Sequence, residues 1–424
     1  MSARAGLSVA LTAGGVPLDK ALASLRKLEP EARAFWIYDL DAFEARARRF
    51  MTAFAPLAPL AALALKANAL PALLERACAI GLGADAVSLG ELELARAAGF
   101  PSARRVLNGN GRTEEEARWA AEQGVHSVNA DAPAELDVLE RAAAAAHRVL
   151  RVALRVNPRI ATPNHPYVAT GDHDSKFGMD DDEALAAWTG RARWPHLRVE
   201  GLHLHVGSQL VDLEPLEQTA TFALDLAARA AAAGAPLAFI NLGGGFGVDY
   251  EGAAHEFPLE RWAERLASLA ARAQLEWVLE PGRWLSAPVG MLVAEVLAVK
   301  TRGGRRFVVL AAGMNDLIRP ALYGARHRVV AVAPRAGEPG VASVVGPVCE
   351  SADVFDAEAL LPPLEPGDLV ALMDAGAYGA SMASNYNGRG RLAELVVSGG
   401  KLTRARAGES AADLMARRTN DALE

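Results

Sequence analysis

A lysine at the end of an apolar run is the first residue in this sequence whose type and place suggest chemistry. Residues 61–65 are apolar throughout, as in a strand buried on both faces, and Lys66 follows them directly. Such a strand has no structural need for an ammonium group. A primary amine at this place can bond to an aldehyde carbon, although a solvated lysine at a strand end is the plain alternative.

Two glycine-containing segments farther along the chain are suited to hold an anion. The segment NLGGGFG contains Gly243, Gly244 and Gly245, and such a run lets backbone N–H groups approach a phosphate closely. The segment LEPGRW adds Gly282 as a further N–H donor and places Glu280 beside it. A plain tight loop is the alternative for the glycine run. Glu280 is an unusual residue beside a phosphate site unless it has a cationic partner.

The segment GLHLHVGSQ supplies imidazoles and a hydroxyl. His203 and His205 are two residues apart, so on a strand they share one face, and Ser208 follows where it can donate to a phosphate. Two core histidines are the alternative, but a position at the strand end favours exposure of His205 in a site.

Lysine, carboxylate, imidazole and a glycine cradle together describe a pyridoxal phosphate site. Lys66 would form the Schiff base with the cofactor's aldehyde, and the glycines would hold its phosphate. Glu280 would keep the pyridine nitrogen protonated, and a flat side chain such as His205 would stack on the ring. The sequence therefore predicts pyridoxal 5'-phosphate as the cofactor.

The elements that must position these residues alternate between short apolar segments and longer segments of helical period. This rhythm predicts a (β/α)8 barrel, in which the carboxyl ends of the strands build the site. An open doubly wound sheet would also alternate, but it usually has a glycine-rich turn after its first strand, and none is present. The eight expected strands are 62–66, 84–88, 105–108, 127–130, 152–156, 201–205, 239–242 and 277–280. The polar residues at their ends are Lys66, Asp85, Asn108, Asn157, His205, Gly243 and Glu280.

The flanking segments predict a second domain. Residues 33–40 have the composition of a strand, and after residue 286 strand-like segments follow one another with few helical periods. We expect an N-terminal segment, 1–45, whose strand pairs into the C-terminal domain. The barrel takes residues 46–285, and a β-sandwich or partly closed β-barrel takes residues 286–424. Residues 409–424 read as a short helix or tail, and the alanine-rich runs ERAAAAAHR and AARAAAAGAP read as helices.

Composition limits the class of protein. A formal net charge of −7 argues against general nucleic-acid binding, and no stretch reaches the roughly 20 apolar residues that a membrane span needs. Cys78 and Cys349 make no disulfide framework, which favours a cytoplasmic location, and no zinc-binding spacing occurs, so no metal is expected. A small-molecule substrate is the expected partner.

From about Phe35 to Val397 the chain resembles the diaminopimelate decarboxylases, a family of fold-type III pyridoxal-phosphate enzymes. The shared motifs are ALKAN, HPYVATGDHDSKFGM, GLHLHVGSQ, GGGFG, EPGR, GMNDLIRPALYGA, GPVCES and DAGAYGASMASNYN. The resemblance implies decarboxylation of meso-2,6-diaminopimelate to L-lysine and carbon dioxide. It also implies a homodimer with shared active sites.

The resemblance also assigns roles to individual residues. It implies that Lys66, His205, Glu280 and Cys349 are catalytic, with Cys349 as the proton donor. The implied cofactor-binding residues are Lys66, Asp85, His205, Ser208, Gly243, Gly244, Gly245, Glu280, Gly282, Arg283 and Tyr378. The implied substrate-binding residues are Arg283, Arg319, Tyr323, Glu350 and Tyr378. Cys349 and Glu350 would reach in from the partner subunit.

The roles that the resemblance implies favour one substrate. Arg283 and Arg319 would need a carboxylate partner if they bind the substrate, which favours diaminopimelate over ornithine, lysine or arginine. Three departures from the family pattern leave further substrates open, including one from secondary metabolism: Ala311 where Asp is usual, Leu89 where Gly is common, and NYNGRGR for NYNSRPR. A racemase of related barrel design and a non-catalytic regulatory relative also stay open, although the presence of Lys66 and Cys349 disfavours the regulatory relative.

Overall fold

The computed structural model describes residues 11–160, 176–252 and 256–416. It divides into two compact units. The barrel unit comprises Glu44–Asp249 and Ala254–Leu285, and the sheet unit comprises Met1–Phe43, Tyr250–Ala253 and Ser286–Glu424. Most of the motif HPYVATGDHDSKFGM falls in 161–175, outside the described residues.

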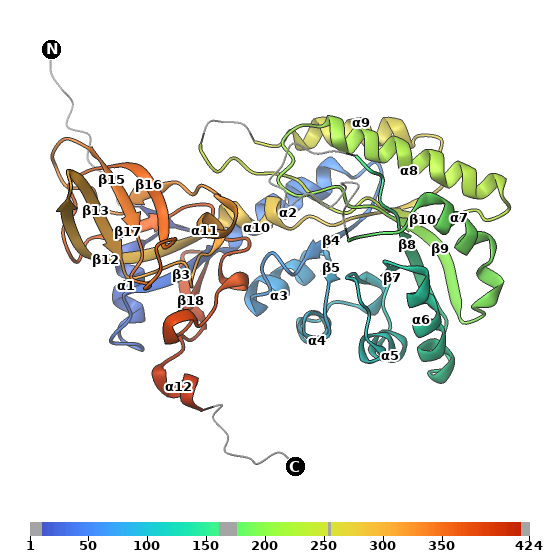
Figure 1. Ribbon diagram of the computed structural model, residues 1–424, viewed down its shortest axis with the longest axis horizontal. Coiled ribbons are helices and arrows are strands. Elements are labelled where there is room, and N and C mark those ends of the chain that lie inside the picture. Colours follow the sequence, from blue (N-terminus) through green and yellow to red (C-terminus); the bar gives the residue numbers. More distant parts are fainter. Residues whose placement is uncertain (1–10, 161–175, 253–255, 417–424) are drawn as a thin grey trace. The chain divides into compact units, whose positions relative to one another are not determined.

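The barrel unit is built on a closed barrel of eight parallel strands, which confirms the predicted fold class (Figure 1). Around the barrel the strands follow their order along the chain, β4 to β11, and β11 pairs with β4 to close the ring. All eight expected strands are present. They are β4 (Leu60–Ala64), β5 (Gly83–Ala86), β6 (Arg105–Leu107), β7 (Ser127–Ala130), β8 (Leu150–Arg155), β9 (Leu197–His203), β10 (Phe239–Asn241) and β11 (Glu276–Leu279).

Helices follow the strands and lie around them in Figure 1. Local signals start several of them: Thr113 and Glu116 form a capping box at α5, and a proline opens α3 and α6. The alanine-rich runs are helical as predicted over 140–145 and 227–232, and their last residues lie beyond the helix ends. The helices are α2 (Leu40–Ala53), α3 (Pro71–Ala79), α4 (Leu89–Ala97), α5 (Glu114–Gln123), α6 (Pro133–Ala145), α7 (Asp181–Thr189), α8 (Glu214–Ala232), α9 (Leu259–Ala270) and α10 (Arg283–Ser286).

Apolar side chains fill the barrel. One cluster contains Ala62, Val106, Ala153, Phe239 and Val278, all fully buried. Phe239 lies so close to β9 that a Cβ on Gly201 would come within 2.2 Å of its ring. The barrel is therefore a packed core, and its chemistry must lie at the strand ends.

The sheet unit contains a nine-stranded sheet. The N-terminal strand β3 pairs antiparallel with β12 and parallel with β18, so it belongs to the C-terminal sheet as predicted. The long strand β12 also pairs with β13 and β17. The strands are β3 (Ala34–Asp39), β12 (Gly290–Arg302), β13 (Arg305–Leu310), β14 (Val329–Ala331), β15 (Gly340–Val345), β16 (Val354–Leu361), β17 (Leu369–Leu372), β18 (Glu394–Ser398) and β19 (Lys401–Arg406).

Short elements complete the sheet unit. A two-stranded sheet, β1 (Thr12–Ala13) with β2 (Val16–Pro17), precedes α1 (Leu18–Leu25), whose apolar face packs on the sheet's core. The unit also contains α11 (Arg319–Tyr323) and α12 (Ala411–Met415), the latter within the expected terminal helix. In the part of the chain that the structure describes, none of the helices has the length and apolar character that crossing a membrane requires.

Candidate active site

Lys66 lies in the turn that follows β4. The strand ends at Ala64, two residues earlier than expected, because the N–H of Ala67 turns back to the carbonyl of Ala64. Leu65 still extends the ladder toward β5 by donating to the carbonyl of Asp85. This pairing brings the Lys66 ammonium to 3.8 Å from Asp85 Oδ2, with 38% of the lysine side chain exposed.

Two buried carboxyl groups, Asp85 in β5 and Glu280 after β11, share one amide. Asn108, directly after β6, donates from Nδ2 to Asp85 Oδ1 and to Glu280 Oε1, both at 2.6 Å. Asn241, at the end of β10, donates to the same Glu280 oxygen at 2.6 Å. Asn129 in β7 donates to Asn108 Oδ1, also at 2.6 Å. These side chains thus form one hydrogen-bonded cluster at the strand ends, which we call the barrel cluster.

The surroundings of Asp85 and Glu280 shift the pKa values of these two groups in opposite directions. Burial and the nearby charge of Glu280 raise the pKa of Asp85 to about 8. Burial also opposes ionisation of Glu280, but His203 and Lys66 outweigh it and hold the pKa of Glu280 below its ordinary value. These shifts favour the ionised form of Glu280 and the protonated form of Asp85. Carboxylates whose pKa values are pushed apart in this way are typical of a catalytic site.

The two histidines of the segment GLHLHVGSQ occupy different places. His203 is buried with its Nε2 3.7 Å from Glu280 Oε2. His205 is half-buried just past β9, and its Nδ1 accepts the N–H of Gly244 at 3.3 Å. The proton of the neutral ring therefore lies on Nε2. Burial lowers the pKa of His205 well below its ordinary value, so a neutral, flat ring is available at the barrel mouth.

The glycine run packs too tightly for side chains. A Cβ on Gly244 would lie 2.1 Å from the carbonyl oxygen of Glu280, and one on Gly245 would lie 2.7 Å from that of Gly207. Gly243 and Gly245 also have positive φ angles of 65° and 101°. Gly243 and Gly244 already donate their N–H groups, to Asn241 Oδ1 and to His205. These two glycines thus shape the loop, and the remaining N–H groups are those suited to an anion.

Ser208 and Arg283 meet beside this loop. The Arg283 guanidinium is buried and donates from Nη2 to Ser208 Oγ at 2.8 Å. Arg283 begins α10 directly after Gly282, whose backbone packs against Ala64 and Ala67 next to Lys66. The structure therefore brings together the barrel residues assigned to lysine, carboxylate, ring and phosphate roles.

These residues fit pyridoxal phosphate. The lysine supplies an amine, the tightly packed glycine loop offers backbone N–H groups, and Ser208 with Arg283 suits a phosphate. Among the described residues, Asp85 Oδ2 and both ring nitrogens of His203 are buried without a hydrogen-bond partner. Such atoms mark a site built for a polar group.

The sheet unit holds the residues assigned to the substrate other than Arg283. Arg319 and Tyr323 lie on α11 four residues apart, hence on one face. His327 Nδ1 faces the carbonyl of Met373 at 2.9 Å, so it carries the proton, and Nε2 accepts from Arg319 at 2.7 Å. The buried Arg319 guanidinium also stacks on Tyr250, 4.6 Å from the ring centre. Sequence reasoning missed His327 and Tyr250, because neither lies in a motif singled out for chemistry.

Cys349 and Glu350 lie on the turn between β15 and β16 and are exposed. The N–H of Cys349 donates to Asn387 Oδ1 at 2.8 Å, and the Tyr386 hydroxyl donates to a Glu350 carboxylate oxygen at 3.4 Å. The motif NYN therefore holds the motif GPVCES by side-chain contacts. Exposure of both residues suits groups that act on another surface.

Tyr378 has a backbone conformation that tyrosine rarely adopts. Its φ of 56° lies in the left-handed region, and Asp374, four residues earlier, has the same value. Strain of this kind persists where the surrounding structure enforces it, which is typical of functional sites. The half-buried Tyr378 thus stays a candidate ligand for the phosphate.

Other polar residues of the barrel were not assigned from the sequence. Arg155 at the end of β8 is buried and pairs with Asp131 at 3.2 Å, and it stacks on Phe177 at 4.3 Å. The only signal in the sequence was a charge at the end of an apolar strand. Asn157, which follows that strand, accepts the N–H of Arg159.

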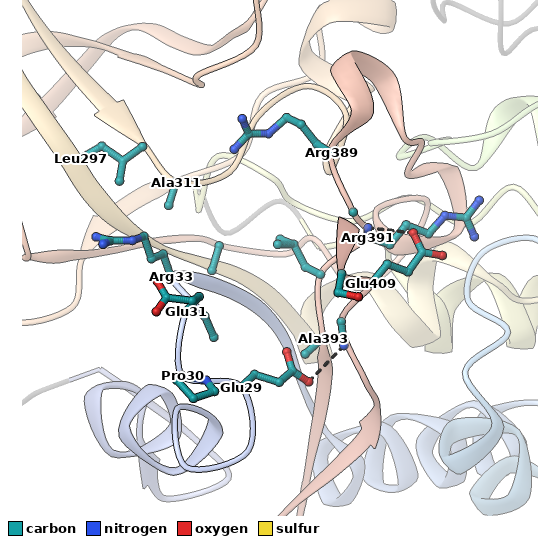
Figure 2. Close-up of a pocket in the computed structure, with 16 residues that line it drawn as sticks. Glu29, Pro30, Glu31, Arg33, Leu297, Ala311, Arg389, Arg391, Ala393 and Glu409 are labelled. Carbon is teal, nitrogen blue, oxygen red and sulfur yellow. Dashed lines mark hydrogen bonds between the residues drawn. The ribbon is translucent and has the colours of Figure 1, made fainter. Parts of the chain in front are cut away.

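A cavity of about 460 Å³ in the sheet unit is lined by residues from two of the three places where the sequence differs from the family pattern (Figure 2). Its lining includes Ala311 and the segment 389–391, with three arginines and three glutamates in all. Glu29 and Glu409 accept backbone N–H groups there. No residue assigned to chemistry lines this cavity, so these departures leave the barrel cluster intact.

Comparison with known proteins gives consistent matches. A family model described as the pyridoxal binding domain of pyridoxal-dependent decarboxylases matches residues 40–287. Diaminopimelate decarboxylase from Zymomonas mobilis is 39% identical over 90% of this chain and 91% of its own length. The enzyme of the same name from Neisseria meningitidis is 38% identical over 92% and 96%.

Solved structures agree. Diaminopimelate decarboxylase from Helicobacter pylori complexed with L-lysine has a TM-score of 0.88 and 36% identity, covering 92% of this chain and 98% of that one. Lysine/ornithine decarboxylase from Vibrio vulnificus, complexed with cadaverine, has a TM-score of 0.78 at 23% identity, covering 89% of this chain and 98% of that one, a likeness of fold alone.

Proposed function

The chain belongs to the pyridoxal-dependent decarboxylases, and from this premise we infer that it converts meso-2,6-diaminopimelate to L-lysine and carbon dioxide. It is a carboxy-lyase that uses pyridoxal phosphate and serves lysine biosynthesis. The observation that carries the substrate is the match to diaminopimelate decarboxylases over about nine tenths of the chain. A relative of that name was solved with L-lysine, which is the expected product.

When bound, pyridoxal phosphate supplies an electron-poor ring that accepts the electron pair left by the departing carboxylate. Lys66 would hold the aldehyde carbon until the substrate amine replaces it. The ionised Glu280 would accept a hydrogen bond from the pyridine nitrogen and keep it protonated, and His205 would lie flat on the ring. Ser208, Gly245, Gly282 and Tyr378 would hold the phosphate.

Three side chains of the sheet unit would bind the far end of the substrate. Arg319, oriented by His327, would bind the distal carboxylate with Tyr323, and Glu350 would bind the distal ammonium. We assign Arg283 to the phosphate side first, because it donates to Ser208. The buried Arg319 then has a carboxylate partner, which a monocarboxylate such as ornithine would not provide.

Cys349 would donate the proton that replaces the lost carboxylate on Cα. Its exposure supports action in a neighbouring copy, so we propose a homodimer with shared active sites. We also propose that residues 46–285 bind the cofactor, that residues 286–424 supply substrate and dimer contacts, and that the N-terminal segment 1–45 belongs with the C-terminal domain through its strand. A cytoplasmic location fits an enzyme of amino-acid synthesis with two thiols outside any disulfide among the described residues.

A turnover assay tests this proposal. The purified protein is incubated with pyridoxal phosphate and, separately, with meso-diaminopimelate, ornithine, lysine and arginine, and the products are identified. L-lysine and carbon dioxide from diaminopimelate alone are expected. Turnover of another amino acid instead would refute the substrate while keeping the chemistry, and no turnover with bound cofactor would favour a regulatory relative.

A further inference from the structure

Asn108 is the residue that joins both carboxylates of the barrel cluster. Its Nδ2 donates to Asp85 Oδ1 and to Glu280 Oε1 at 2.6 Å each. An amide nitrogen has two hydrogens, so each carboxylate receives one of them. Asn108 is itself buried, directly after β6, and its N–H is fixed by the carbonyl of Ala86 at 2.8 Å.

The orientation of this amide is determined by its neighbour. Asn129 donates from Nδ2 to Asn108 Oδ1 at 2.6 Å, so the oxygen of Asn108 must face β7 and its nitrogen must face the carboxylates. Asn129 is also buried, and its backbone carbonyl accepts from Arg112 at 3.2 Å. The amides thus donate in one direction, from Asn129 through Asn108 to the two acids.

We propose that Asn108 is a positioning residue of the decarboxylation: it ties the carboxyl group of Asp85, beside Lys66, to that of Glu280, which would face the pyridine nitrogen, so that the two are held as one unit. This inference rests on the proposed function, since Asn108 acts through Lys66 and Glu280. It adds to the family resemblance, which assigned no role to Asn108 or Asn129.

The geometry explains what the tie achieves. Because Asn108 occupies Asp85 Oδ1, the other oxygen, Oδ2, is the one that faces the Lys66 ammonium at 3.8 Å. On the other side, Asn108 and Asn241 together place two donors on one oxygen of Glu280, which favours its ionised form. Loss of the Asn108 amide must therefore raise the pKa of Glu280, and that of Asp85 as well, since the same amide lowers it.

Other charged and titratable groups also face the pair, and they define the background of any pH measurement. They are Lys66, Glu91, Arg155, His203 and His205. Burial raises the pKa of Glu91, although the N–H of Val87 stabilises its charged form. The side chain of Asn108 bonds to Asp85, Glu280 and Asn129 rather than to these groups, so a change at Asn108 leaves them in place.

The test replaces Asn108 with leucine, which has a similar size but donates no hydrogen bond. We expect kcat for diaminopimelate to fall about 10- to 100-fold, the equivalent of one hydrogen bond to a charged group, with KM changed less than about threefold. The acidic limb of the pH–rate profile should move to higher pH by about one unit, because the Asp85–Glu280 pair becomes easier to protonate.

A second readout needs no substrate. The visible absorbance of the bound cofactor is titrated with pH in wild type and in N108L, since it reports on charges beside the ring. We expect its midpoint to shift in the same direction as the acidic limb. If the wild-type protein does not decarboxylate diaminopimelate, the proposed function is refuted. The titration would still test the role of Asn108, because it does not depend on turnover.

Two further variants separate positioning from mere stability. Asn129→Leu removes the bond that orients Asn108 but touches neither acid, so a shift of the same sign and smaller size is expected. Ser127→Ala removes another fully buried polar group of β7, whose Oγ contacts His126 at 3.0 Å. Its thermal stability should drop without any shift in the titration.

The proposal is overturned if N108L loses thermal stability and activity but keeps the wild-type pH profile and titration. It is also overturned if Ser127→Ala shifts the pH–rate profile and the absorbance titration as much as N108L does. The shift would then be a general consequence of a less stable barrel. If N108L does not fold, the test rests on Asn129→Leu. An absorbance titration of this variant that matches wild type would refute the proposed role of Asn108.

Discussion

Glu280 in the barrel unit and Glu350 in the sheet unit are carboxylates assigned to one reaction, and their surroundings differ. Glu280 is buried and accepts two amide hydrogen bonds at 2.6 Å. Glu350 is exposed, and the Tyr386 hydroxyl lies 3.4 Å from it. A buried charge held by fixed dipoles stabilises one arrangement of charge without reorganising, whereas an exposed one can adapt to what approaches it. We therefore expect barrel substitutions to change rate and protonation, and sheet substitutions to change recognition.

Removal of Lys66 should have the largest effect. Lys66→Ala deletes the amine that bonds the cofactor, so kcat should fall by about four orders of magnitude or more. Turnover of diaminopimelate and the visible spectrum of the protein measure this. Lys300→Ala, at an exposed position of β12, is the control and should behave as wild type. Normal activity of Lys66→Ala would overturn the assignment of the site.

Glu280→Gln should come next. It keeps the shape but removes the charge beside the pyridine nitrogen, so we expect kcat to fall about 10²- to 10³-fold with cofactor still bound. Glu350→Gln should instead raise KM for diaminopimelate about tenfold, the loss of a single charge contact. Steady-state kinetics of both variants measure the comparison, and equal effects on kcat would refute it.

The two cysteines sharpen the contrast. Cys349→Ala should lower kcat about 10²-fold, as loss of a proton donor does, without lowering thermal stability, because the side chain is exposed. Cys78→Ala, at a half-buried position of α3, should cost about 1 kcal/mol of stability and leave kcat unchanged. Wild-type kcat in Cys349→Ala would remove the cysteine from the reaction.

A smaller effect concerns stability and pH. Burial raises the pKa of Asp85 in the barrel unit to about 8 and that of Asp316 in the sheet unit to about 7. In the unfolded chain both release their proton near pH 4, so between about pH 4 and 7 the folded state binds more protons and its stability falls as pH rises. In wild type, each of the two groups should lower the free energy of unfolding by up to roughly 1.4 kcal/mol per pH unit over this range. Asp85→Asn and Asp316→Asn should each abolish the contribution of the residue replaced.

Urea denaturation of the cofactor-free protein at pH 5, 6 and 7 measures this. Asp182→Asn, with 91% of its side chain exposed, is the control and should run parallel to wild type. If the asparagine variants also run parallel to wild type, the proton assignments for Asp85 and Asp316 are wrong.

The sequence predicted the eight barrel strands because each is a short apolar run, and Lys66 and Glu280 because each ends or follows one. It could not predict that Asn108, Asn129 and Asn241 would converge. That depends on which strands are neighbours and on which residues lie level across them, such as Asn129 opposite Ala153. An asparagine after a strand also reads as an ordinary turn residue.

The sheet unit was harder to anticipate. Its residues were assigned through the resemblance, and the partner of Arg319, His327, lies eight residues away beyond a left-handed glycine at 324. No helical or strand period links two such positions. The opposite pKa shifts of Asp85 and Glu280 likewise depend on burial and distance, which a sequence does not specify.

The pairing of β3 with β12 has a consequence for how the chain is made. Tyr38 lies opposite Gly290, with the whole barrel inserted between them. During synthesis on the ribosome β3 emerges early but cannot pair until the barrel segments have followed it. A barrel that folds first would bring its own two ends together and so shorten the loop that the sheet must close. The barrel can thus fold before the sheet is complete, whereas the pairing of β3 with β12 depends on the barrel segments that lie between them.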